Sequence, residues 1–335
     1  MRIGNNPQKD LVLSNPEYLH QIIIPIYIPN QEEYFKESLE ILKVCLNSIF
    51  KTTHNKTFIS IVNNGSCLEV KNYLEELFLN VKIHELIHTE NIGKLNAVIK
   101  GLVGNNIELV TITDADVLFI SGWQEETNKI FDKIPKAGVV GLTPQFKTYS
   151  SYCSNFIFDN LFSRKLRFIP VLDSEAIISF YDSIGWEKNY NQNYLQYNLA
   201  YQLDDLNVLV GSGHYVATYK KDMFEEITSF LGYKLGGDSE TYLDKIQFKK
   251  DYWRLTTQQN FAFHMGNTLE KWVCEIKFQN LKAITYQSGY HKNNKINPVI
   301  YFIKIKLFQK LFSNKNFQMW FLKSKGLPKE MIKNY

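Results

Sequence analysis

The chain has 335 residues, of which 44% are hydrophobic and 14% aromatic, enough to bury the core of a large α/β domain with an appendage. Its net charge is only +4 and its few arginines are scattered, which argues against a dedicated nucleic-acid-binding protein. The four cysteines lie far apart, and neither a signal peptide nor a run of about 18 apolar residues is visible. We therefore expect a cytoplasmic protein without a structural zinc site.

After a polar lead-in at residues 1–20, short apolar runs alternate with segments of helical periodicity. The apolar runs that are typical of buried strands are 21–28, 58–62, 81–87, 109–113 and 138–142. The segments predicted to be helices are 32–50, 68–79 and 93–102. This alternation predicts a mostly parallel, doubly wound sheet, in which ligands bind at the carboxyl ends of the strands.

Two carboxylates, Asp114 and Asp116, directly follow the expected strand 109–113. Side chains two residues apart in an extended chain project to the same side, so both can approach one divalent cation or diphosphate. The same Asp-x-Asp spacing also arises where a strand runs into a solvated turn, so the motif alone leaves both interpretations open.

Residues 145–205 are rich in Tyr, Phe, Asn and Gln and show no clear period. Such a segment either lines a ligand groove or forms the aromatic core of an inserted subdomain. Further along, Asp238 and Glu240 begin a helix-like segment, where carboxylates also complement the helix dipole. His264 ends an apolar run, and a lone histidine in that setting is most often a structural residue.

The tail, residues 298–325, interleaves lysines with large apolar side chains. The lysines are Lys304, Lys306, Lys310, Lys315, Lys323 and Lys325. Two interpretations remain open for this pattern. A basic amphipathic helix can lie at an anionic membrane surface, and a C-terminal helix can equally dock on the domain with its lysines in water.

The order of these pieces resembles the GT-A glycosyltransferases, most closely the inverting family 2, over about residues 20 to 270. Pro25 and Tyr27 resemble the Pro-x-Tyr-Asn signature that ends the first strand, where the aromatic residue lines the nucleobase pocket. Asn64 stands in an Asn-Asn-Gly-Ser segment, where the family usually has Asp-Asp-Gly-Ser, and an amide still donates and accepts hydrogen bonds. Asn91 and Lys94 resemble the Asn-x-Gly-Lys segment that begins a helix beside the nucleotide.

The resemblance also assigns roles to the acidic residues. Asp114 would face the ribose or the metal, and Asp116 would coordinate the cation that bridges the two phosphates. His264 is similar to the late histidine that completes the metal shell in some family members. Asp238 lies where the family places its catalytic base, with Glu240 as the reserve candidate.

The resemblance implies a GT-A domain at 21–275, with residues 145–205 as an acceptor-side insertion, and a helical extension at 276–335. It implies Mn²⁺- or Mg²⁺-dependent transfer of a sugar, with inversion, from a nucleotide-sugar to a hydroxyl group. A UDP-sugar is the expected donor, and a glycan or lipid-linked molecule is the expected acceptor. Such a reaction belongs to surface polysaccharide or glycoconjugate synthesis and can take place at the inner face of a membrane.

Two other functions compete with this interpretation. A nucleotidyltransferase that activates a sugar phosphate also uses paired carboxylates, but it usually has a glycine- and arginine-rich loop after the first strand, and no glycine follows Tyr27 closely. A GT-A-like binding protein without catalytic activity would keep the fold and the nucleotide site. The substitutions at the Asn-Asn-Gly-Ser segment, and Gly237 where the family usually has Glu before its base, keep this second alternative open.

Overall fold

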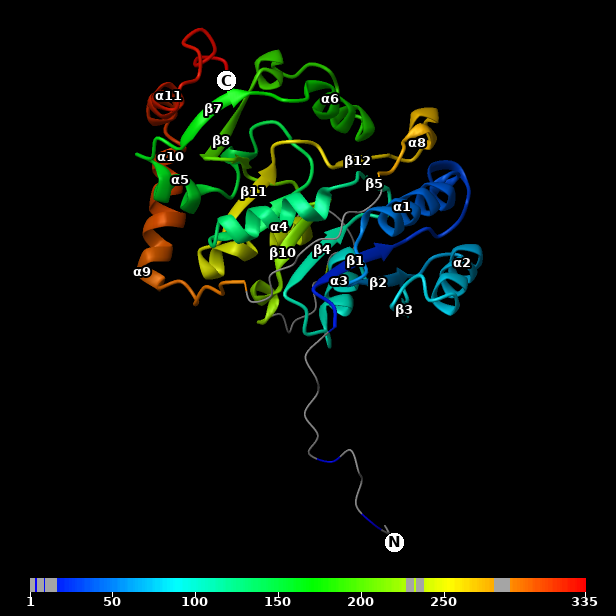
Figure 1. The fold of residues 1–335 in the computed structure, drawn as a ribbon. Coiled ribbons are helices and arrows are strands. Elements are labelled where there is room, and N and C mark those ends of the chain that lie inside the picture. The colour runs from blue at the N-terminus through cyan, green and yellow to red at the C-terminus, as the bar shows by residue number, and fades with distance from the viewer. Residues whose placement is uncertain (1–3, 5–8, 10–16, 227–231, 233–237, 280–289) are drawn as a thin grey trace.

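A ten-stranded sheet forms the centre of the computed structural model, which describes residues 4, 9, 17–226, 232, 238–279 and 290–335 (Figure 1). The strand order across the sheet is β3-β2-β1-β4-β10-β6-β11-β9-β8-β7. These strands are β1 (His20–Ile26), β2 (Thr57–Asn64), β3 (Glu85–Thr89), β4 (Leu109–Thr113), β6 (Ala137–Gly141), β7 (Leu166–Pro170), β8 (Tyr197–Leu203), β9 (Leu206–Val210), β10 (Val216–Lys220) and β11 (Trp253–Thr257). A smaller sheet pairs β5 (Val117–Phe119) with β12 (Ala262–His264).

The first half of the large sheet is parallel, as the β/α alternation predicts. β3, β2, β1 and β4 run in one direction, connected by α1 (Ser38–Thr52), α2 (Leu68–Leu79) and α3 (Lys94–Leu102). Successive side chains of β1 face opposite sides. Ile22 and Ile24 pack in the cluster that contains the buried residues of α1, whereas Ile23 packs in the cluster that contains those of α3. Helices therefore cover both faces of the sheet, which confirms the predicted α/β fold class.

The predicted strand at 81–87 begins later than expected. Val81 has a φ of 55°, and the amide of Lys82 donates to the carbonyl of Leu77. Val81 and Lys82 therefore belong to the turn that ends α2, and the Val81 side chain is exposed. β3 therefore occupies Glu85–Thr89.

Residues 145–205 extend the same sheet. They supply β7 and β8, which form an antiparallel meander with β9, and the helices α5 (Ser154–Asn160) and α6 (Ser174–Ser183). Tyr149, Phe156 and Phe168 are buried in one core cluster with Leu255 of β11. For these aromatic residues, the interpretation as a structural core is the one that the fold supports.

The second half of the sheet is mixed because β10 lies antiparallel between β4 and β6, while β11 is parallel to β6. The remaining helices in this part are α4 (Trp123–Lys133), α7 (Asp238–Lys245) and α8 (Lys271–Glu275). Short 3-10 turns are η1 (Glu33–Phe35), η2 (Thr148–Ser150), η3 (Gln192–Leu195), η4 (Lys221–Phe224) and η5 (Ile246–Lys250).

The C-terminal segment is helical and packs on the domain. It consists of α9 (Pro298–Tyr301), the π-helical segment η6 (Phe302–Leu307), α10 (Phe308–Phe312) and α11 (Lys315–Ser324). In Figure 1 these helices run along the side of the molecule that carries α5 and β7. Phe308, Phe312 and Phe321 are buried in the same cluster as Phe156. None of the helices in the described part of the chain is long and apolar enough to cross a membrane.

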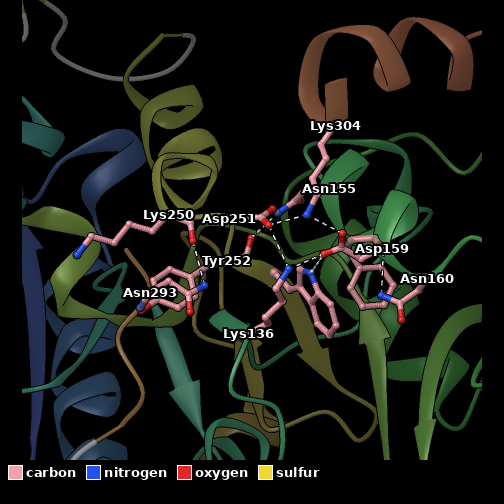
Figure 2. Close-up of polar contacts among 11 residues, drawn as sticks. Lys136, Asn155, Asp159, Asn160, Lys250, Asp251, Tyr252, Asn293 and Lys304 are labelled. Atoms are coloured by element: carbon pink, nitrogen blue, oxygen red, sulfur yellow. Dashed lines mark hydrogen bonds and ion pairs between the residues drawn. The ribbon is translucent and has the colours of Figure 1, made fainter. Parts of the chain in front are cut away.

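An ion-pair network holds this segment in place (Figure 2). Lys304 of η6 reaches Asp159 of α5 and Asp251 before β11, with both N–O distances 2.6 Å. Lys136 approaches the same two carboxylates from the other side, at 2.7 and 3.1 Å. Lys325 is likewise buried and donates to the carbonyls of α5 and the turn after it. Two of the six tail lysines are thus bound within the protein.

Candidate active site

The carboxyl ends of β1, β2 and β4 lie at one edge of the sheet, beside a cavity of about 510 Å³. Sites for small molecules range from roughly 300 to 1,000 Å³. The cavity is lined by all of the predicted nucleotide-binding residues, namely Pro25, Tyr27, Asn64, Asn91, Lys94 and Asp114, and by Asp116. A second cavity, of about 300 Å³, is lined by Lys220 and Lys221 and contains none of these residues.

The loop between β3 and α3 is fixed by the two predicted asparagines. Oδ1 of Asn64 accepts a hydrogen bond from the amide of Ile92 (2.9 Å), and Oδ1 of Asn91 accepts one from the amide of Gly93 (3.2 Å). Gly65 is required between them, because it has a φ of 88° and a Cβ there would lie 2.9 Å from the amide nitrogen of Asn91. The side-chain oxygen of each asparagine therefore holds the backbone of the loop that forms this wall of the cavity.

Lys94 forms an ion pair with Asp114 at the entrance to α3. Both side chains are largely covered by protein, and Gly93 at the helix N-cap has a φ of 88° that lets the loop turn toward β4. The amide of Asp114 donates to the carbonyl of Tyr215 (2.9 Å), which anchors the end of β4. The pairing with Lys94 places the first aspartate of the motif next to a cation supplied by the protein.

Asp116 and His264 are brought together by the smaller sheet. Val117 of β5 pairs with His264 of β12, and the amide of Met265 donates to the carbonyl of Asp116 (2.8 Å). As a result, Nε2 of His264 lies 3.4 Å from Oδ2 of Asp116. About a third of the Asp116 side chain (32%) is exposed, yet its Oδ1 is buried and has no hydrogen-bond partner. Burial raises the pKa of this carboxyl above its usual value, and His264 opposes that rise.

These two side chains fit a divalent cation. A buried carboxylate oxygen without a donor is an unsatisfied acceptor, and a bound cation would satisfy it. Oxygen ligands with one imidazole suit Mn²⁺ or Mg²⁺. Within the ranges that the structure describes, no group of three His, Cys, Asp or Glu side chains is close enough to hold a metal ion. The remaining ligands would have to come from a bound molecule or from water.

Comparison with known protein families identifies the chain. The sequence model of glycosyl transferase family 2 matches residues 22–227, more than half of the chain. The protein belongs to this family. The match confirms the resemblance seen in the motifs, all of which except Asp238 and His264 lie within the matched residues.

Solved structures of glycosyltransferases are similar to this family 2 protein at low sequence identity. S. aureus TarS is 11% identical, with 73% of this chain and 36% of TarS covered and a TM-score of 0.44. A shorter TarS form in complex with UDP-GlcNAc is 10% identical, with 94% and 69% covered and a TM-score of 0.43. The mannosyltransferase PcManGT from Pyrobaculum calidifontis, in complex with GDP-Man and Mn²⁺, is 15% identical, with 94% and 75% covered and a TM-score of 0.45. This chain thus spans about a third of the length of full TarS. No curated protein sequence matches it.

The predicted base of this family 2 protein, Asp238, is the first residue of α7. Its side chain and that of Glu240 lie outside the described residues. The C-terminal end of α7 is anchored by polar contacts: Asp244 accepts from Arg254 (2.6 Å) and lies 3.5 Å from Nδ1 of His214. Arg254 also donates to the carbonyl of Ser212. The last turn of α7 is therefore tied to the segment between β9 and β10.

The structure adds residues that the sequence did not indicate. Tyr34, Phe35, Gly266 and Asn267 line the cavity. Ser183, the last residue of α6, lies 3.0 Å through its Oγ from Nδ1 of His264. The aromatic, aperiodic character of residues 145–205 gives no signal for this serine, because its position depends on α6 lying against β12.

Proposed function

We propose that this family 2 protein is a glycosyltransferase that moves a sugar from a nucleotide-diphosphate donor to a hydroxyl group, with inversion at the anomeric carbon. The observation that carries the proposal is the approach of Asp116 and His264 beside a cavity lined by Tyr27 and Lys94. The aromatic ring, the lysine and the two metal-binding side chains are suited to the three parts of such a donor, the base, the diphosphate and its cation.

The donor would bind with its base toward Tyr27. The Tyr27 side chain is 42% exposed, and its ring stands edge-on to Phe35 with 6.2 Å between the centroids. An open aromatic face of this kind can stack on a nucleobase. Lys94 would contribute positive charge near the phosphates, while Asp114 holds its side chain. We take a UDP-sugar as the first donor to test.

Asp116 and His264 would hold the divalent cation, Mn²⁺ or Mg²⁺, through a carboxylate oxygen and Nε2. When bound, such an ion neutralises the charge that develops on the departing nucleoside diphosphate. The orphaned Oδ1 and the Nε2 of His264 supply two ligand positions, and the diphosphate oxygens of the donor would supply others.

Asp238 would remove the proton from the acceptor hydroxyl as the new C–O bond forms. A single displacement inverts the anomeric carbon, so an α-linked donor would give a β-linked product. We place the acceptor on the side of α6, where Trp186 is 54% exposed and its ring lies edge-on to Tyr181 at 5.0 Å. An exposed indole face suits the apolar face of a sugar ring, as expected for a glycan or a lipid-linked saccharide.

We further propose that the tail contacts an anionic membrane, where lipid-linked acceptors are made. Lys306 and Lys310 are exposed on η6 and α10, which also carry exposed apolar side chains, and Lys315 and Lys323 are exposed on α11. This surface remains available after the buried phenylalanines have docked on the domain. It combines positive charge with apolar area, as interfacial helices do.

A nucleotide-release assay tests the function. Purified chain would be incubated with UDP-, GDP- and dTDP-sugars, with Mn²⁺ or with EDTA, and with glycan acceptors. We expect acceptor-stimulated release of one nucleoside diphosphate that requires the metal and is lost in Asp116→Asn. Release of pyrophosphate from a nucleoside triphosphate and a sugar phosphate would support a nucleotidyltransferase instead. Metal-dependent binding without any turnover would support a binding protein.

A further inference from the structure

We propose that Ser183 is a positioning residue that keeps a proton on Nδ1 of His264 and so leaves the Nε2 lone pair of the neutral ring available to a cation bound beside Asp116. This inference deepens the proposed function, on whose cation site it rests. It concerns a side chain of α6, outside the motifs, and assigns it a role through His264.

The hydrogen bonds of Ser183 determine the direction of its contact with His264. Its hydroxyl donates to the carbonyl of Phe180 at 2.7 Å, the preferred length for an O–H donor. A serine hydroxyl has one hydrogen, so Oγ can only accept at its second contact, 3.0 Å from Nδ1 of His264. We therefore assign the proton of this contact to Nδ1.

Packing contacts alone do not determine which edge of the His264 ring faces Asp116, and the hydrogen bond with Ser183 does. Phe180 and Tyr215 both stand edge-on to the His264 ring, with interplanar angles of 83° and 81°. These contacts fix the plane of the ring, but a 180° rotation about the Cβ–Cγ bond restores the same plane and would satisfy them nearly as well. After such a turn Ser183 would face a ring carbon and lose its hydrogen bond. The serine therefore favours the orientation in which Nε2 lies 3.4 Å from Asp116.

The close approach of α6 to β12 makes this contact possible. Gly266 has a φ of 69°, and a Cβ there would lie 3.0 Å from the carbonyl oxygen of Ser183. A larger residue would be strained at this φ and would push the end of α6 away from His264. Gly266, two residues after His264, thus allows Ser183 to lie close enough to contact the histidine.

Metal-binding histidines generally donate their second ring N–H to a protein acceptor, which fixes the tautomer and makes the ligating nitrogen more basic. Loss of such an acceptor typically weakens metal affinity by about 10- to 100-fold. Ser183 supplies this acceptor here. We infer that the affinity for a free divalent cation depends on a hydroxyl group at position 183.

The test compares Ser183→Ala and Ser183→Thr with the wild-type chain. Imidazole ¹⁵N shifts of the metal-free, histidine-labelled protein would report the tautomer at a pH where His264 is neutral, and the His264→Gln spectrum would assign its signals. We expect the Nδ1–H tautomer in the wild type and in Ser183→Thr. In Ser183→Ala we expect an increased population of the Nε2–H form.

Manganese binding is the second readout, measured by EPR with Mn²⁺ alone. We expect an increase in Kd of about 10- to 100-fold for Ser183→Ala and a much smaller change for Ser183→Thr. Ser324→Ala is the matched control, because Ser324 also ends a helix and donates to the carbonyl three residues earlier (2.8 Å) but contacts no histidine. Thermal melts would confirm that all variants are folded.

The outcomes separate this inference from the proposed function. An Nε2–H tautomer in the wild type, or an unchanged tautomer in Ser183→Ala, would overturn the role of Ser183. Absence of Mn²⁺ binding in the wild type, together with a tautomer that responds to Ser183, would retain the positioning role and overturn the cation site. Equal Mn²⁺ affinities of Ser183→Ala and Ser324→Ala would overturn the effect on the metal.

Discussion

Nε2 of His264 lies 3.4 Å from Oδ2 of Asp116, although Asp116 lies within the residues that match the family model, 22–227, and His264 lies beyond them. The pairing of β5 with β12 creates this approach, because His264 stands opposite Val117 and Met265 bonds the backbone of Asp116. A two-stranded sheet thus acts as the scaffold of the candidate metal site.

The first prediction separates the function of Asp116 from its effect on stability. Asp116→Asn should abolish metal-dependent nucleotide binding, measured by calorimetry with UDP and Mn²⁺. Its Tm without metal should be unchanged or higher, because burial raises the pKa of Asp116 and its charge is therefore unfavourable in the metal-free fold. His264→Ala should weaken metal binding less, since water can replace one ligand. Asp132→Asn, on the exposed side of α4, is the control. Undiminished metal-dependent binding in Asp116→Asn would refute the assignment.

The second prediction concerns the base. Asp238→Asn should lower kcat by several orders of magnitude with little change in donor affinity, because the lost interaction acts in the transition state. Steady-state kinetics together with calorimetric donor binding would measure the two effects separately. Ser239→Ala, the neighbouring position in α7, is the control. Near-normal kcat in Asp238→Asn combined with collapse in Glu240→Gln would transfer the role to Glu240.

The parallel half of the fold could be predicted from sequence because its strands are continuous apolar runs with clear ends. β4 was expected at 109–113 and lies at Leu109–Thr113, where β-branched residues give way to Asp114. β10 could not be predicted in the same way. Its five residues include Thr218 and Lys220, and its place between β4 and β6 depends on pairing with strands far away in the sequence.

The candidate site shows the same division. Tyr27, Lys94 and Asp116 could be proposed because the short motifs that contain them resemble those of family 2, and all three line the cavity. The ion pair between Lys94 and Asp114 could not, since spacing does not reveal which charged groups meet. Ser183 could not be predicted either, because its contact with His264 exists only where α6 packs beside β12.

The third prediction concerns the docking of the tail. Lys304→Met leaves Asp159 and Asp251 with Lys136 as their cationic partner in this network and should lower the free energy of unfolding by about 3 kcal/mol, as for other largely buried pairs. Lys306→Met, two residues along and exposed, is the control and should have little effect. Urea titration would measure both. Equal stability of the two variants would show that the network does not hold the tail.

The stability difference between wild type and Lys304→Met should also depend on pH. Burial alone would raise the pKa of Asp251, but hydrogen bonds from Lys304 and Asn155 and the nearby Lys136 lower it overall. A lowered pKa stabilises the fold above the pKa of the unfolded chain, about 3.9 for aspartate, and this stabilisation is lost as the pH falls through the folded value. We therefore expect the difference to be full near neutral pH and to narrow below about pH 4. A difference that stays constant down to pH 3 would contradict this account.

The fourth prediction concerns the exposed surface of the tail. Deleting residues 298–335 would remove Phe308, Phe312 and Phe321 from the core, so truncation cannot separate docking from membrane contact. Point variants on the exposed face can. Phe302 and Leu307 are 59% and 55% exposed, and the double variant Phe302→Gln and Leu307→Gln leaves the buried phenylalanines in place.

The full chain should bind vesicles that contain anionic lipid, and salt should weaken this binding, because each lysine near such a surface contributes on the order of 1 kcal/mol. The double variant should lose most of the binding in a sedimentation assay while keeping the wild-type Tm. Leu79→Gln, on α2 and 80% exposed, is the matched control and should bind as the wild type does. If the wild type ignores anionic vesicles at low salt, the tail serves only to complete the core, and its exposed lysines only face water.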